Sequence, residues 1–134
     1  MNVLIVEDDF SSRLLLQKLL APFGECDIAV NGKEAVFGFR TALEDGQPYS
    51  LVCLDIMMAE MGGHAALKEM RALEEARGIV STEGAKIIMI TALADIKNVS
   101  SAYNELCDGY LVKPIDQSKM IELLKELKFV EKKK

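Results

Sequence analysis

Acidic side chains directly follow the first and third of the short apolar runs in this sequence. Glu7 and Asp8 come after residues 3–6, and Asp55 comes after residues 51–54. If these runs are parallel strands, their carboxyl ends meet at the edge of the sheet where open α/β folds bind ligands. Three carboxylates in one cleft repel each other and need a cation to stay ionised. Because the ligands are all oxygens, the predicted ion is Mg²⁺.

Two more polar residues end other apolar runs and complete a set that suits phosphoryl transfer. Thr91 follows residues 86–90, and Lys113 follows residues 109–112. A lysine ammonium is a compact charge that suits a phosphate, and the threonine hydroxyl adds a hydrogen-bond donor. A nucleophilic carboxylate, Mg²⁺, a lysine and a hydroxyl around one point favour phosphoryl transfer onto an aspartate. The predicted product is an aspartyl phosphate.

Each of these residues has a simpler interpretation when it is taken alone. The Glu7-Asp8 pair could cap a helix, and so could Asp55. Thr91 could bond only to local backbone. Lys113-Pro114 could simply end a strand. The functional interpretation therefore depends on the joint placement of these residues at four strand ends.

The apolar runs alternate with segments of helical period, which predicts repeated βα units around one parallel sheet. The predicted strands are residues 3–6, 26–30, 51–54, 86–90 and 109–112. Four of them are apolar enough to be covered on both faces, whereas the second contains Asp27 and is predicted to be an edge. Ser11 or Asp9 is the expected N-cap of the first helix. The predicted helices cover residues 11–20, 33–43, 63–73, 96–106 and 117–127, and residues 76–85 form a surface insertion.

Length and composition indicate one acidic domain, residues 1–134, with a charged tail over residues 129–134. The chain has 134 residues, with 16 Lys and Arg against 21 Asp and Glu and a net charge of −5. This balance argues against direct binding to nucleic acid. The odd number of cysteines indicates free thiols in a reducing compartment. No apolar stretch approaches the roughly 18 residues of a membrane span, so we expect a cytoplasmic protein without membrane insertion.

Four stretches around these polar residues match a known family in combination. They are residues 4–9 (LIVEDD), 54–63 (LDIMMAEMGG), 90–92 (ITA) and 109–115 (GYLVKPI). At these residues the chain resembles the receiver domain of two-component response regulators, over essentially its whole length. The resemblance implies an α/β, flavodoxin-like, doubly wound sheet of five parallel strands in the order 2-1-3-4-5, with five helices.

The resemblance also implies the roles of the acidic residues. Asp55 would be the phosphoacceptor, taking a phosphoryl group from a histidine kinase or a histidine phosphotransfer protein. Asp8 would bind Mg²⁺ directly and Glu7 mostly through water, with Asp55 and the main-chain carbonyl of Met57 as further ligands. Mn²⁺ can take the place of Mg²⁺. Such a protein is a signalling phosphoacceptor that catalyses its own phosphorylation and dephosphorylation, and is not an enzyme in the ordinary sense.

The remaining residues would make a switch, again by resemblance. Lys113 would pair with the phosphate and with the oxygens of Asp55, positioned by a cis peptide bond to Pro114. Thr91 would move toward the phosphoryl group and leave space into which the ring of Tyr110 turns. The face made of the fourth helix, the fifth strand and the fifth helix would then change its affinity for a downstream protein. A dimer that depends on phosphorylation is compatible with such a switch.

Two departures from the family pattern carry further expectations. Where the family usually has Met-Pro-x-Met-Asp-Gly, residues 58–63 read MAEMGG, so we expect a looser loop and weaker Mg²⁺ binding. The two positions that tune hydrolysis in the family hold the apolar residues Met57 and Leu93. Neither can orient an attacking water, which predicts slow self-dephosphorylation.

Other functions fit the sequence less well. A pseudo-receiver that signals without phosphate is the main alternative, and the complete set of site residues argues against it. An aspartate-based phosphatase would need an acid at Met57, and a flavodoxin would need a hydroxyl-rich loop where Glu7 and Asp8 stand. His64 is interpreted as a surface residue of a helix. Whether the chain is a stand-alone regulator or part of a longer protein stays open.

Overall fold

The computed structural model describes residues 1–80, 82–92 and 106–129. Five strands form one parallel sheet in the order β2-β1-β3-β4-β5. This order confirms the flavodoxin-like topology implied by the resemblance. The strands are β1 (Asn2–Val6), β2 (Glu25–Ala29), β3 (Leu51–Asp55), β4 (Lys86–Ala92) and β5 (Gly109–Lys113).

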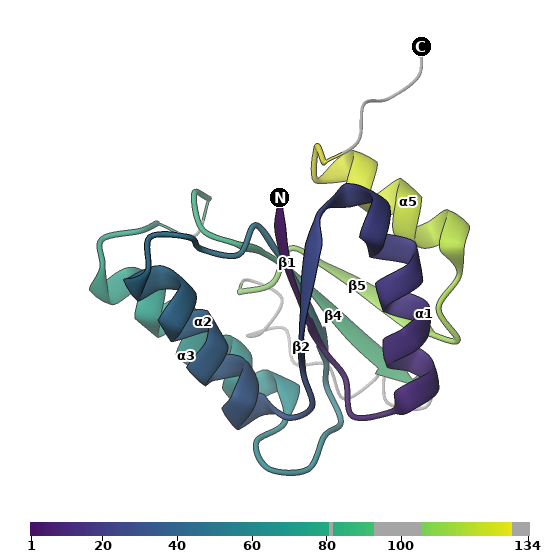
Figure 1. Ribbon diagram of the computed structural model, residues 1–134, viewed down its shortest axis with the longest axis horizontal. Helices are drawn as coiled ribbons and strands as arrows, with labels where there is room; N and C mark the ends of the chain where they lie inside the picture. Colours follow the sequence, from purple (N-terminus) through teal and green to yellow (C-terminus); the bar gives the residue numbers. More distant parts are fainter. Residues whose placement is uncertain (81, 93–105, 130–134) are drawn as a thin grey trace.

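Helices cover both faces of the sheet (Figure 1). Helices α2 (Gly32–Glu44) and α3 (Gly63–Ala76) pack on one face, where Phe39 and Met70 join the core. Helices α1 (Phe10–Leu20) and α5 (Gln117–Glu126) pack on the other, and a short 3₁₀ turn (Ala21–Phe23) follows α1. The helix predicted over residues 96–106 lies outside the described residues, apart from Leu106.

The central strands are buried because each presents apolar side chains to both layers of helices. In β1, Val3 and Ile5 belong to one core cluster, and Leu4 and Val6 belong to the other. All five residues of β3 are buried. This alternation on two apolar faces is what a doubly covered parallel strand requires.

The two edges of the sheet differ from this centre. Strand β2 is an edge, as Asp27 predicted. Strand β5 was predicted to be covered on both faces, but it is the other edge and only Leu111 is buried in it. The apolar run predicted a buried strand, but the run alone does not say how many neighbours that strand has.

Of the four α-helices in the described ranges, three begin with a side-chain cap. The Asp9 carboxylate accepts a hydrogen bond from the amide of Ser12, so Asp9 and not Ser11 caps α1. Asn31 caps α2 and Asp116 caps α5 in the same way. Gly62 begins α3 without a side-chain cap, so Asp55 does not serve as a cap for that helix.

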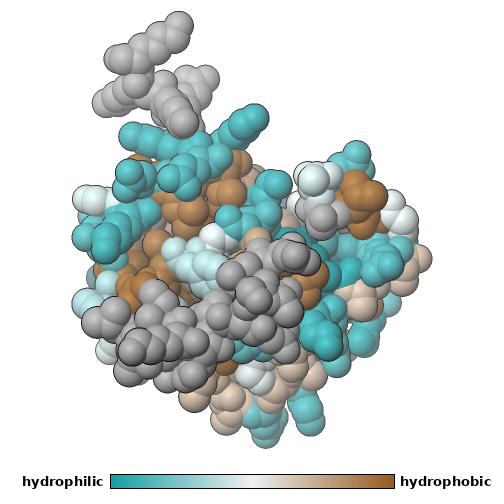
Figure 2. Space-filling model, turned by 180° about the vertical axis from the view of Figure 1, so that it is seen from behind, coloured by the Kyte–Doolittle hydropathy of each residue, from teal (hydrophilic) through white to brown (hydrophobic). Residues whose placement is uncertain are grey.

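On the face opposite to that of Figure 1, the described residues carry separate apolar patches (Figure 2). Seen from behind, hydrophobic and hydrophilic residues are interspersed on the part of this face that is described (Figure 2). Cys26, Cys53 and Cys107 are all free thiols. None of the helices within the described ranges has the length and apolar character needed to cross a membrane.

Candidate functional site

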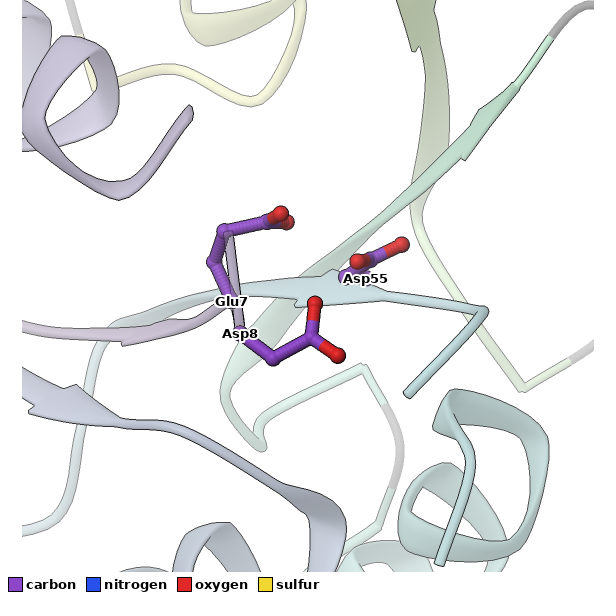
Figure 3. A group of neighbouring side chains, drawn as sticks. All are labelled: Glu7, Asp8 and Asp55. Atoms are coloured by element: carbon purple, nitrogen blue, oxygen red, sulfur yellow. The ribbon is translucent and has the colours of Figure 1, made fainter. Parts of the chain in front are cut away.

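Three carboxylates meet at the carboxyl end of the sheet. Glu7 and Asp8 follow β1, and Asp55 ends the neighbouring strand β3. One carboxylate oxygen from each residue lies within 4.8 Å of those of the other two. Figure 3 shows the side chains of Glu7 and Asp8 extending from the end of β1 toward the side on which Asp55 lies. The fold therefore brings together the three acids that the sequence predicted to share a site.

The three acids differ in their contact with solvent. Glu7 is fully buried, with 0% of its surface exposed, and Asp55 is 4% exposed. Asp8 is exposed. A ligand therefore approaches past Asp8, and the two buried carboxylates form the floor of the site.

Lys113 contacts two of the three acids. It ends β5, the edge strand two positions from β3 in the sheet. Its Nζ atom lies 2.9 Å from Oε1 of Glu7 and 3.4 Å from Oδ2 of Asp55. Burial opposes the charge of Lys113, but the hydrogen bond to Glu7 and the charge of Asp55 raise its pKa above the usual value. The lysine stays charged in this site, beside the acceptor oxygen.

Glu7 is the group whose protonation is most altered. Burial and the neighbouring Asp55 charge raise its pKa to about 7, although the hydrogen bond from Lys113 works in the opposite direction. Oε2 of Glu7 is buried and has no hydrogen-bond partner among the described residues. A buried carboxylate oxygen without a partner is costly, and a cation or a cation-bound water would satisfy it.

These observations fit a hard divalent cation. The donors are all carboxylate oxygens, and three acids face one lysine. Oxygen donors of this kind suit Mg²⁺, which usually keeps several water molecules. The site can therefore hold a magnesium ion between Glu7, Asp8 and Asp55.

The predicted switch pair lies on neighbouring strands. Thr91 is fully buried in β4, and its hydroxyl donates to the carbonyl oxygen of Ala92 at 3.2 Å. Thr91 is in register with Val112, and Met89 is in register with Tyr110. Because residues two apart in a strand share a face, Thr91 and Tyr110 are on the same face of the sheet. Tyr110 is half-buried and packs against the core on the side of α2 and α3.

The other predicted site residues surround the acceptor. Met57 is 63% exposed, and its amide donates to Oδ1 of Asp55 at 3.2 Å. The peptide bond between Lys113 and Pro114 is cis. Leu93 lies outside the described residues. His64 is partly buried at the start of α3, and burial lowers its pKa.

Two contacts near the acids were missed by the sequence analysis. Arg13 donates from Nη1 to the main-chain carbonyl of Glu7 at 3.2 Å, and the amide of Asp9 donates to Oε1 of Glu7 at 3.3 Å. Arg13 stands one helical turn after the cap Asp9, which places it over the strand end. The sequence could have indicated this contact, because Arg13 is a basic residue in the first turns of the helix that follows the acidic end of β1.

Comparison with known proteins agrees with this arrangement. Residues 3–125 match the family model of the response regulator receiver domain. The chain belongs to this family. Receiver domains are signalling phosphoacceptors that bind Mg²⁺ in their active site, and they interact with phosphotransfer proteins and downstream partners.

Individual relatives cover almost all of this receiver domain. It is 32% identical over 126 residues to the transcriptional regulatory protein ZraR of Salmonella typhimurium, an alignment that covers 93% of this chain and 26% of ZraR. The chain therefore spans about a quarter of the length of that relative.

Two solved structures are similar to the whole receiver. In the CheX-CheY-BeF3-Mg+2 complex from Borrelia burgdorferi, the match has a TM-score of 0.79 and 27% identity, and it covers 98% of this chain and 90% of that one. In the complex of the Saccharomyces cerevisiae phosphotransfer protein Ypd1 with the receiver domain of Ssk1, the match has a TM-score of 0.76 and 26% identity, and it covers 94% of this chain and 87% of that one.

Proposed function

We propose that this receiver domain is phosphorylated on Asp55 by a phosphohistidine donor, and that the phosphoryl group changes its affinity for a partner protein. The observation that carries the proposal is the group of three carboxylates within 4.8 Å, together with a lysine that contacts two of them. A purely structural site would balance these charges. This one has a surplus of negative charge and a buried oxygen of Glu7 that has no partner within the described part of the chain.

The transfer needs little from the protein beyond positioning and charge. An oxygen of Asp55 attacks the phosphorus, the bond from phosphorus to the donor imidazole nitrogen breaks, and the imidazole leaves with the bonding electron pair. Lys113, 3.4 Å from Oδ2 of Asp55, faces the charge that develops on the phosphoryl oxygens. The amide of Met57 holds the other oxygen, Oδ1, and so orients the carboxylate.

The acids of the site would hold Mg²⁺ during this reaction. Asp8 and Asp55 would supply direct oxygen ligands, Glu7 would contribute mostly through water, and the main-chain carbonyl of Met57 would be the fourth protein group of the set. Bound Mg²⁺ supplies charge neutralisation, which lets an anionic phosphoryl group approach an anionic carboxylate. Mn²⁺ offers similar oxygen-ligand chemistry.

A switch can follow from the placement of Thr91 and Tyr110. Among the described residues, the Thr91 hydroxyl donates to the carbonyl next to it, and a phosphoryl oxygen offers it a stronger, charge-assisted acceptor. Its movement would free space on the face of the sheet where Tyr110 packs. We propose that Tyr110 turns inward in response, and that the face including β5 and α5, with the helix predicted over residues 96–106, then binds a downstream protein.

The donor protein would contact the rim around the acids. Large apolar side chains are exposed there, with 67% of Phe10 and 40% of Leu14 accessible on α1 and Met57 accessible on the other side. An apolar rim around a charged centre suits a protein partner. Because the three cysteines are free thiols, we expect this encounter in the cytoplasm. Phe10→Ala should slow transfer from a phosphotransfer protein but not from acetyl phosphate.

The test of the proposal is direct. The protein is incubated with MgCl₂ and acetyl phosphate, and its intact mass is measured. We expect a mass increase of one phosphoryl group in the wild type and none in Asp55→Asn, with Asp45→Asn as the control because Asp45 ends α2 away from the site. A wild type that gains no mass, or a gain that persists in Asp55→Asn, would refute the proposal.

The lifetime of the phosphorylated form is a further prediction. The apolar residues Met57 and Leu93 cannot orient a water for attack on the aspartyl phosphate. We therefore expect slow hydrolysis, accelerated on the order of tenfold by Met57→Asn or Leu93→Glu. Decay of the phosphorylated mass after removal of the donor measures it. Unchanged decay in both variants would show that these positions do not limit hydrolysis here.

A further inference from the structure

The first residue of α2 contacts the loop that follows the acceptor strand. This acceptor loop comprises residues 56–62, between β3 and α3. The amide of Gly32 donates to the carbonyl oxygen of Met61 at 3.1 Å. Gly32 opens α2, so its amide has no carbonyl partner within the helix, and the positive end of the helix favours an oxygen there. The end of α2 and the acceptor loop can be followed in Figure 1.

The contact leaves no room for a side chain on Gly32. A Cβ atom there would overlap the carbonyl oxygen of Met61 and lie 2.9 Å from its carbonyl carbon. These are backbone atoms, which cannot turn aside as the end of a side chain can. Gly38 is on the same helix, and a Cβ atom there would meet nothing within 4 Å. Close approach to the loop therefore restricts position 32 and not position 38.

The acceptor loop has an unusual backbone at the point of contact. Glu60 has φ of 48° and Met61 has φ of 71°, in the left-handed region that residues with a side chain rarely adopt. Such a conformation persists when the surrounding structure over-determines it. Two hydrogen bonds hold the base of the loop. The amide of Ile56 donates to the carbonyl oxygen of Ile90, and the amide of Gly63 donates to the carbonyl oxygen of Ile56, both at 2.9 Å.

The contacts at the base leave the turn at Glu60 and Met61 to be held by α2. Ala59 does not fix a backbone angle as proline would, and Gly62 provides no side-chain cap for α3. Among the described residues, the backbone of Met61 is contacted from outside the loop by the amide of Gly32. The side chain of Met61 also packs against the core on the side of α2.

We infer that Gly32 is a positioning residue for phosphoryl transfer, acting through Met61 on the acceptor loop. This inference rests on the proposed function of Asp55. The loop begins at the acceptor and includes Met57, whose amide orients the Asp55 carboxylate. Displacement of Met61 would shift the groups that hold Asp55 and the metal, and shifts of about 1 Å can slow a positioned reaction on the order of a hundredfold.

The test compares three variants in full-length protein at a temperature where all of them are folded. Gly32→Ala forces Met61 away, Gly38→Ala adds the same methyl group to open space, and Asn31→Ala removes the cap of α2 without touching Met61. Phosphorylation by acetyl phosphate is followed by intact mass, and Mg²⁺ affinity by titration calorimetry. We expect Gly32→Ala to lose on the order of tenfold in both, and the other two to stay close to wild type.

Two outcomes would overturn the inference. Gly32→Ala could behave like wild type, or Asn31→Ala could match its loss, which would make the effect one of helix stability alone. If the wild type is not phosphorylated, the proposed function fails, but the Mg²⁺ titration still tests the position of the loop.

Amide hydrogen exchange keeps the inference testable if Gly32→Ala does not fold. In Asn31→Ala, the amide of Glu34 loses its acceptor on the cap and should exchange faster. The amide of Gly32 donates to Met61 and should keep its protection, as should the amide of Gly63 at the base of the loop. Equal loss of protection at Gly32 and Glu34 would show that Gly32 belongs only to the helix end.

Discussion

The protein has two charged clusters at opposite ends of its sheet, and they are built differently. At the amino ends of β4 and β5, Arg71 of α3 donates to Glu74 at 2.7 Å and to Asp108 at 2.9 Å. It also donates to the carbonyl oxygens of Leu106 and Ala85. At the carboxyl ends, three acids face Lys113.

The two clusters differ in how many of their buried oxygens have hydrogen-bond partners. In the Arg71 cluster, the second oxygen of Glu74 accepts from the amide of Ala85, and Oδ2 of Asp108 also accepts from the amide of Ile87. In the acceptor site, Oε2 of Glu7 is buried with no partner among the described residues. A satisfied buried network holds a fold together, whereas an unsatisfied one with surplus charge is prepared for a ligand.

The largest expected effect breaks the satisfied cluster. Arg71→Met leaves the buried Glu74 without its cation, and we expect a loss of about 3–5 kcal/mol in the free energy of unfolding. Urea unfolding measures it. Arg13→Met is the matched control, because Arg13 is only partly buried and its loss should cost about 1 kcal/mol or less. Equal costs for the two variants would contradict the structural role of Arg71.

A smaller effect concerns the pH dependence of the acceptor site without metal. Burial raises the pKa of Glu7 from 4.5 in the unfolded chain to about 7. Between these values the folded protein keeps a proton that the unfolded chain releases, so stability falls as pH rises. The expected fall is on the order of 1–3 kcal/mol. Urea unfolding in EDTA from pH 5 to about 8 measures it, and Glu7→Gln should flatten that part of the profile. A variant with the same slope as wild type would assign the titration to another group.

Mg²⁺ should stabilise the folded protein by compensating the surplus negative charge of the acceptor site. At ten times its dissociation constant, an ion that binds only the folded state adds about 1.4 kcal/mol of stability. We expect this gain in the wild type and its loss in Asp8→Asn, measured by thermal unfolding with and without MgCl₂. Asp45→Asn should keep the gain, since Asp45 lies at the end of α2. A gain that survives in Asp8→Asn would place the ion elsewhere.

The smallest expected effect restores the family pattern in the acceptor loop. Ala59→Pro with Gly62→Asp should fix one backbone angle and cap α3, which now begins without a side-chain cap. We expect about 0.5–1 kcal/mol of added stability and tighter Mg²⁺ binding. Calorimetric titration checks the second point. Unchanged affinity and unchanged loop exchange would reject the expectation that the native loop is loose.

Much of the fold could be predicted from local pattern. The order of apolar runs and helical segments predicted the parallel sheet, and Asp27 predicted the edge at β2. The exposure of β5 was predicted wrongly, because an apolar run reports what its side chains prefer and not which strands pair with it. Helix ends were predicted to within one to three residues, and Asp9 rather than Ser11 proved to be the cap of α1.

The sequence predicted which residues form the site, but it did not predict all of the contacts that hold them in place. Glu7, Asp8 and Asp55 could be placed together because parallel strands end at the same edge. The hydrogen bond from Arg13 to Glu7 and the contact of Gly32 with Met61 could not, because each depends on how a helix is oriented over the sheet.

The sequence by itself determined which residues are available for chemistry and that they end parallel strands, because hydrophobic period and the succession of strands and helices along the chain can be read locally. Only the tertiary structure decided that Arg71 bridges Glu74 and Asp108, and that Lys113 also reaches Glu7. The bonds from Arg71 to Asp108 and from Lys113 to Glu7 join residues that are 37 and 106 positions apart. No local preference of either residue encodes such a pair, which forms because folding brings both into the same buried space.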